Sequence, residues 1–148
     1  MKKISESIKV FLDSQKLGYV ATVSPNGLPN LSPKGTIVAW NEKTLAFADI
    51  RSPNTIKNLE NNHSLEINVI DPLVRKGFRF KGKGTIIKNG EIYENILKVY
   101  RERGVKSPIG AIVLVEVNDI LEVTSPLYDL GISEYEMKQK WKKHFTDL

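Results

Sequence analysis

Alternating apolar and polar positions run through much of the chain and predict a mainly β structure. Residues 65–69 alternate with a period of two, as in a strand with one buried face. Residues 77–87 continue this pattern over a longer stretch, with Phe78 and Phe80 on one side and Arg79 and Lys81 on the other. The predicted strands are 19–23, 31–40, 44–48, 65–69, 77–87 and 112–123.

Apolar residues at helical spacing predict helices between some of these strands. The spacing predicts an amphipathic helix over 4–15, a second from Ser52 and a third over about 91–103. A last helix begins at Ser133, which forms a capping-box pattern with Glu136. Because the strands follow one another closely and are joined by turns, most of their pairs are expected to be antiparallel.

The elements together predict a mainly β fold with flanking helices (α+β), built as a small closed or split barrel. We expect a single domain over 1–148, in which 125–148 form a C-terminal tail and helix. Tyr128 and Trp141 in this tail would cover a ligand or pack an interface, and we favour packing because large aromatic residues mostly supply buried area.

Composition excludes several kinds of chemistry. The chain has 148 residues, no cysteine and two histidines, so disulfides, thiolate nucleophiles and cysteine-held metals are excluded, and no metal site is expected. No apolar run is as long as a membrane span and the N-terminus has no signal-peptide pattern, which favours a cytoplasmic protein without a membrane partner. The net charge of +5 permits an anionic ligand or a nucleic acid.

The segment FADIRSPNTIKNLENN, residues 47–62, predicts a strand end, a polar turn and a helix start. Ser52 suits the N-cap and Pro53 the first helical position. Ser52, Asn54 and Thr55 then lie beside unpaired backbone N–H groups, where a phosphate can bind; the alternative is an ordinary capped helix. Asp49 before the turn either accepts a hydrogen bond from a ligand or belongs to the turn alone.

Two further segments carry candidate binding residues. In NLSPKGT, residues 30–36, Pro33 and Lys34 either protect an edge strand or, with Gly35, let a flat ligand lie on the backbone beside a positive charge. The basic stretch 75–82 is either a solvated face, a rim for an anionic cofactor or a weak match to an RNA-recognition motif. No triad, carboxylate pair or phosphate loop is present, so a cofactor would carry any chemistry.

Four segments in this order resemble the pyridoxamine 5′-phosphate oxidase-like family of FMN-binding split β-barrels: ATVSPNGLPNLSPKG, LAFAD, RSPNTIKNLENN and VRKGFRFKG. The resemblance covers roughly residues 5 to 125 and implies a six-stranded antiparallel split barrel. It also implies a homodimer that holds FMN at the subunit interface. The cofactor-binding positions that it implies are Ser32, Pro33, Lys34, Gly35, Ala48, Asp49, Ser52, Asn54, Thr55, Lys76, Gly77 and Phe78, the last three commonly from the partner subunit.

The chain departs from the oxidase at the phosphate. The oxidase has Arg-Lys where Asn54 and Thr55 stand here and an arginine at Ser32, and Lys34, Lys57, Arg75 or Lys76 are the candidates to compensate for these charges. The oxidase's C-terminal substrate segment has no clear counterpart, so pyridoxamine phosphate oxidation is not expected. A Thr55→Glu substitution is expected to repel the phosphate and leave the fold intact.

The resulting hypothesis is an FMN-dependent oxidoreductase whose substrate and catalytic residues are unknown. There are three alternatives: a flavin-binding or electron-transfer protein without turnover, a deazaflavin or haem binder in the same cleft, and a nucleic-acid-binding barrel. The nucleic-acid-binding barrel is the least favoured.

Overall fold

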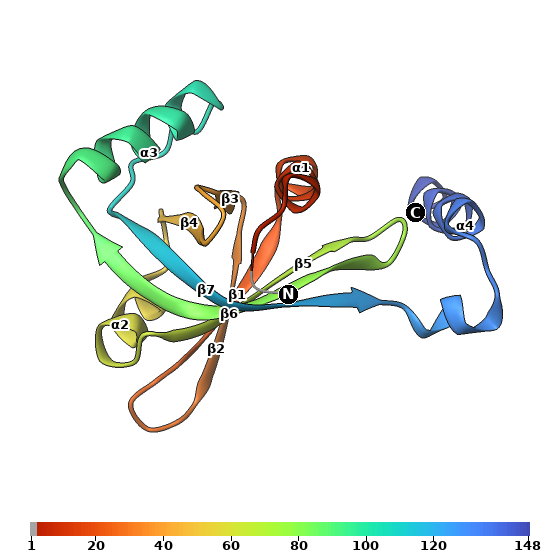
Figure 1. Ribbon diagram of the computed structural model, residues 1–148, viewed down its shortest axis with the longest axis horizontal. Helices are drawn as coiled ribbons and strands as arrows, with labels where there is room; N and C mark the ends of the chain where they lie inside the picture. Colours follow the sequence, from red (N-terminus) through yellow and green to blue (C-terminus); the bar gives the residue numbers. More distant parts are fainter. Residues whose placement is uncertain (1–2) are drawn as a thin grey trace.

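Residues 3–148 are described by a computed structural model, in which one curled antiparallel sheet forms a half-barrel (Figure 1). The strand order is β2-β1-β5-β6-β7-β4-β3, and every neighbouring pair is antiparallel. The predicted fold class is therefore confirmed, with seven strands where six were expected. The strands are β1 (Gly18–Val23), β2 (Pro29–Lys34), β3 (Val38–Ala39), β4 (Thr44–Asp49), β5 (Ser64–Asp71), β6 (Lys76–Ile87) and β7 (Ala111–Thr124).

The additional strand arises because the stretch predicted as one strand over 31–40 is divided. β2 pairs only with β1 and β3 only with β4, so the two halves form opposite edges of the sheet. Pro33 lies in edge strand β2, where its missing N–H leaves no inner strand unpaired. The three residues 35–37 connect one edge to the other and bring the end of β2 close to β4.

The main core fills the inside of the curled sheet. Helix α1 (Glu6–Gln15) contributes Ile8 and Leu12, which pack with Phe47 of β4 and Phe80 of β6. All four side chains are almost fully buried. Burial of such large apolar side chains contributes roughly 1.5–3 kcal/mol each to folding. The cluster therefore stabilises the curled form of the sheet, in which Lys34 at the end of β2 reaches Phe47 of β4.

A second cluster lies on the outer face of β4. Helix α3 (Glu91–Glu102) places Ile96 and Tyr100 against Ala46 and Ala48. Because successive side chains of a strand point to opposite faces, β4 is buried on both sides, with Phe47 facing the inner core. Helix α2 (Pro53–Asn61) follows β4 and buries Asn58, whose amide donates a hydrogen bond to Thr22 of β1 at 3.1 Å.

The C-terminal tail consists of the 3₁₀ turn η1 (Pro126–Leu130) and helix α4 (Glu134–Thr146), and it lies at the far end of the molecule from α3 (Figure 1). Ser133 caps α4 as predicted, since its Oγ accepts the N–H of Glu136, but the Glu136 carboxylate accepts the Ser133 hydroxyl and not the backbone N–H that completes a capping box. Within α4 only Met137 is buried. No helix formed by residues 3–148 has both the length and the apolar character needed to cross a membrane.

Candidate functional site

Lys34 is a buried cation at the end of β2. Its ammonium donates to Ser32 Oγ at 2.9 Å and lies 5.9 Å from the centre of the Phe47 ring, and the residue is only 7% exposed. No carboxylate of residues 3–148 forms a salt bridge with it. Burial lowers the pKa of Lys34 below its ordinary value, and the charge of Asp49 offsets part of this effect. A buried ammonium without a paired anion is costly, so an anionic ligand would relieve this cost.

Asp49 ends β4 just before α2 and accepts hydrogen bonds from Ser52. Its Oδ1 accepts the Ser52 N–H at 3.1 Å and the Ser52 hydroxyl at 2.9 Å. Ser52 therefore stands at the predicted N-cap position but its side chain does not cap the helix. Pro53 is at the first helical position, as predicted. A phosphate at this helix start would compete with Asp49 for Ser52.

The other two residues predicted at the helix start differ in accessibility. Asn54 is exposed, whereas Thr55 is fully buried. The Thr55 hydroxyl has no hydrogen-bond partner among the described residues. The backbone N–H groups of residues in the first turn of a helix, here those of Asn54 and Thr55, have no intrahelical acceptor. Asn54 therefore presents its side-chain donors to solvent, while the Thr55 hydroxyl is buried and unpaired among the described residues.

Three further residues predicted to contact the cofactor lie in surroundings that differ from those of the Lys34 side chain. Ala48 is buried against α3, and its N–H donates to Thr36 Oγ1 at 2.9 Å. Pro33 is exposed and has the opposite parity to Lys34 on β2. Gly35 is exposed, and the nearest atom to a Cβ added there would be the Lys16 carbonyl oxygen at 3.5 Å. The Gly35 backbone is therefore accessible on the side where other residues carry a Cβ.

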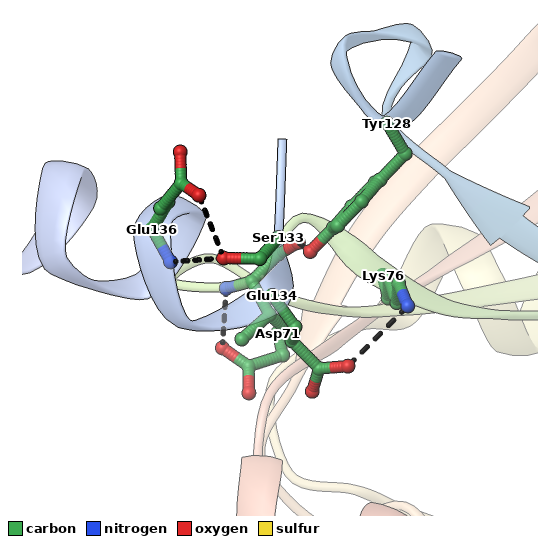
Figure 2. A network of polar contacts seen from close by, with 7 residues as sticks. Asp71, Lys76, Tyr128, Ser133, Glu134 and Glu136 are labelled. Carbon is green, nitrogen blue, oxygen red and sulfur yellow. Dashed lines mark hydrogen bonds and ion pairs between the residues drawn. The ribbon is translucent and has the colours of Figure 1, made fainter. Parts of the chain in front are cut away.

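The other part of the predicted site lies at the start of β6, next to the C-terminal tail. Lys76 begins β6 beside α4, away from β4 and α2 (Figure 1). Its ammonium lies 3.3 Å from Glu134 Oε2 and 4.4 Å from the centre of the Tyr128 ring (Figure 2). Tyr128 in turn donates its hydroxyl proton to the Val74 carbonyl. The tail therefore contacts the part of β6 that the sequence assigns to the cofactor.

Gly77 and Phe78 are explained first by packing. A Cβ on Gly77 would lie 2.0 Å from the Val69 carbonyl oxygen, so the approach of β5 requires glycine. Phe78 packs edge-to-face on Phe11 of α1, with ring centres 5.3 Å apart. Lys76, Gly77 and Phe78 nevertheless line one cavity of about 370 Å³, a volume in the range of small-molecule pockets.

A second cavity, of about 350 Å³, opens beside the link between β2 and β3. Gly35 and Thr36 line it, together with Tyr100 from α3. Lys34, Asp49 and Ser52 line neither of these two cavities. Within one chain, the anion-attracting residues and the β6 residues are therefore not brought together.

The basic residues of β6 face solvent away from its aromatic rings. Arg79 and Lys81 both lie near Glu66 of β5, at 3.7 and 3.4 Å, so part of their charge is neutralised. Phe80 is fully buried on the inner face. Nucleic-acid surfaces combine basic groups with exposed rings on which bases stack, and this strand separates the two.

Sequence reasoning missed Tyr100 and Thr36. Tyr100 was part of an apolar helix stripe, and its hydroxyl gave no signal of its own. Thr36 had a weak signal, because Ser32, Lys34 and Thr36 share one parity in an otherwise irregular stretch. The contact of Thr36 with Ala48 joins this stretch to β4 and could not be read from spacing.

Comparison with known proteins is consistent with this architecture. HupZ from Group A Streptococcus is 32% identical, covers 82% of this chain and 95% of its own, and superposes with a TM-score of 0.74. An FMN-binding protein from Syntrophomonas wolfei (17% identity, 81% and 86% coverage, TM-score 0.71) and an F420 reductase (21%, 79% and 98%, 0.60) share the fold. No match was found among the curated proteins.

The family model described as pyridoxamine 5′-phosphate oxidase matches residues 4–119, which is most of the chain and leaves out the tail. All four segments quoted above for the resemblance lie within these residues. The chain belongs to the pyridoxamine 5′-phosphate oxidase family.

Proposed function

We propose that the protein binds FMN and is a flavin-dependent oxidoreductase of the cytoplasm whose substrate is not pyridoxamine phosphate. The observation that carries this proposal is Lys34, a buried ammonium that has one hydrogen bond within residues 3–148, to Ser32. Ser32 stands where the oxidase has an arginine, so the Lys34 ammonium supplies a positive charge at that position. Family membership and the FMN-binding relative support flavin as the ligand.

The residues of this chain fit the phosphate of FMN in a particular way. Lys34 would neutralise the phosphate, and the exposed Asn54 at the start of α2 would donate to it. Asp49 would have to release Ser52 before that residue could contribute its donors. Bound FMN would supply hydride transfer at its N5 atom, while the protein would hold the cofactor and exclude water from it.

The cofactor site is proposed to form between two copies of the chain. Lys34 lies at the end of edge strand β2 and Lys76 at the start of β6, with β1 and β5 between these strands in the sheet, and neither cavity described above contains both residues. A second copy would bring its own Lys76, Gly77 and Phe78 to the Lys34 surface. This arrangement explains why residues that share a ligand in the family do not share a cavity in one chain.

The absorption spectrum of the purified protein, followed by titration of FMN and of riboflavin, tests the proposal. Lys34→Met keeps the length of the side chain and removes its charge. We expect it to weaken FMN binding at least about tenfold, because a hydrogen bond to a charged group contributes roughly 1.5–3 kcal/mol. Riboflavin lacks the phosphate, so its affinity should change little.

Lys98→Met, at an exposed position of α3 outside the segments assigned to the cofactor, is the matched control and should bind FMN like the wild type. A wild-type protein that shows no saturable FMN binding would refute the proposal. Equal losses of FMN and riboflavin affinity in Lys34→Met would instead place Lys34 away from the phosphate.

Flavin binding without turnover is the second candidate. Both histidines, His63 and His144, are exposed. The Asp49 carboxylate, whose charge acts on Lys34, already accepts two hydrogen bonds from Ser52. Among the described residues, the site therefore offers no unengaged acid or base for proton transfer. Steady-state oxidation of a reduced nicotinamide by the FMN-loaded protein separates the enzyme from the carrier.

A further inference from the structure

The sequence contains Asn-Gly twice, as Asn26–Gly27 between β1 and β2 and as Asn89–Gly90 between β6 and α3. In such a pair the backbone nitrogen of glycine can attack the side-chain amide carbon of asparagine, because glycine has no side chain that hinders the approach. All four residues are exposed. Exposure is therefore the same at the two pairs, whereas their hydrogen bonds differ.

The Asn26–Gly27 pair is held by hydrogen bonds within its turn. The Gly27 N–H donates to the Ser24 carbonyl at 2.9 Å, and the Ser24 hydroxyl donates to the side-chain oxygen of Asn26. The Ser24 hydroxyl oxygen also accepts the N–H of Leu28 at 3.0 Å, which fixes the turn further. The bonds made by the Gly27 nitrogen and the Asn26 amide must both break before these groups can react, so the folded turn opposes the reaction.

The Asn89–Gly90 pair lacks these restraints. Within residues 3–148, neither the Asn89 side chain nor the Gly90 N–H has a hydrogen-bond partner. The Gly90 carbonyl accepts the N–H of Glu94 at 3.0 Å, so the acceptor of this peptide is engaged while its nitrogen is not. A Cβ added to Gly90 would meet no atom within 4 Å. The side chain of Asn89 can therefore rotate towards the Gly90 nitrogen without breaking a contact.

We propose that Asn89 is a site of spontaneous deamidation in the folded protein, whereas Asn26 is protected. The Gly90 nitrogen loses its proton and forms a bond to the side-chain amide carbon of Asn89. The side-chain nitrogen takes up a proton and leaves as ammonia, which produces a cyclic imide. Water then opens the imide at either carbonyl and leaves aspartate or isoaspartate at position 89. The whole reaction consumes one water molecule and releases one ammonia molecule.

The surroundings of Asn89 accept the product. The new carboxylate lies next to the N-terminus of α3, whose partial positive charge attracts it, and Glu91 and Glu94 in the first turn oppose this attraction. Isoaspartate adds one carbon atom to the backbone of an exposed link. Ile96, which packs α3 against β4, lies farther along the helix. We therefore expect the modified protein to stay folded.

Incubation of the purified protein at mildly alkaline pH, followed by digestion at acidic pH and mass spectrometry of the two peptides, tests the proposal. We expect Asn89 to convert at least about tenfold faster than Asn26, because two hydrogen bonds at Asn26 must break first. The same protein unfolded in urea is the matched control. Both pairs are then released from the fold, and their rates should become similar.

Asn89→Gln keeps the amide but lengthens the side chain, which slows ring closure. This variant should lose the early gain of negative charge that isoelectric focusing of the intact folded protein detects. Equal rates at the two sites in the folded protein, or an intact Asn89 while the unfolded chain reacts, would overturn the proposal. So would persistence of the early charge gain in Asn89→Gln, or a rate difference that remains in urea, because flanking residues and not the turn would then protect Asn26.

Discussion

The guanidinium of Arg75 lies 3.6 Å from the centre of the Trp141 ring and thereby joins the β5–β6 turn to α4. Arg75 has a φ of 57°, and its carbonyl accepts the N–H of Ser125. Tyr128 contacts the same turn through Val74 and Lys76 (Figure 2). Within one chain, both tail aromatics therefore pack against the β5–β6 turn, whereas the sequence analysis favoured packing at a subunit interface.

Trp141→Ala should detach α4 while the half-barrel remains folded. The cation–π contact contributes roughly 0.5–2 kcal/mol and the lost burial adds to it, so we expect about 2 kcal/mol less stability. Denaturant unfolding measures this loss, and limited proteolysis reports release of the tail. Tyr135→Ala, at a position of α4 that is 73% exposed, should change stability by less than about 0.5 kcal/mol. Equal effects of the two substitutions would contradict the Arg75 contact.

The buried Lys34 should make stability depend on pH. Its pKa in the folded protein lies below the ordinary value of 10.5. Between these two values the unfolded chain holds more protons, so the free energy of unfolding of the flavin-free wild type should rise with pH. Lys34→Met lacks this rise, and the stability difference between the two proteins should shift in favour of the wild type as pH approaches 10.5. Parallel curves for both proteins would show that the ammonium is solvated.

Thr55→Val should stabilise the flavin-free protein by roughly 1 kcal/mol, because it replaces an unpaired buried hydroxyl by a methyl group of similar size. Thermal unfolding without flavin measures the gain. Thr55→Ser keeps the hydroxyl and is expected to show no gain. A loss of stability in Thr55→Val would mean that the hydroxyl has a partner in solution.

The burial of Thr55 also corrects one expectation from the sequence. Thr55→Glu was expected to leave the fold intact, but it would bury an unpaired carboxylate at a position that is 0% exposed. Asn54→Glu, one residue earlier and exposed, places the same charge at the start of α2 without that cost. We expect Asn54→Glu to keep the stability of the protein and to weaken FMN binding at least about tenfold, whereas Asn54→Gln should not. Unchanged FMN affinity in Asn54→Glu would show that the phosphate does not bind at the start of α2.

Subunit complementation should reveal whether the cofactor site is shared. Lys34→Met and Lys76→Met are each expected to bind FMN poorly. In a mixed dimer, a shared site recovers one intact set, because Lys34 comes from one copy and Lys76 from the other. FMN titration of refolded mixtures should therefore show regained high-affinity binding. A monomeric mass in the presence of FMN, or no regain on mixing, would contradict a shared site.

The sequence determined the elements whose signals are local. The alternation of residues 77–87 predicted that Arg79 and Lys81 face solvent while Phe80 is buried, and the structure confirms this division. The N-cap at Ser133 and the proline at the start of α2 were equally readable. These features depend on neighbours within a few residues, which spacing alone reveals.

Only the tertiary structure decided the state of the candidate site residues. Sequence spacing placed Ser32 and Lys34 on one face, but not the curvature of the sheet that buries the ammonium beside Phe47. It could not show that Asp49 accepts hydrogen bonds from Ser52 or that the Thr55 hydroxyl is buried without a partner among the described residues. Burial and pairing depend on strand register and helix packing between residues far apart in the chain, and a local pattern contains no information about those contacts.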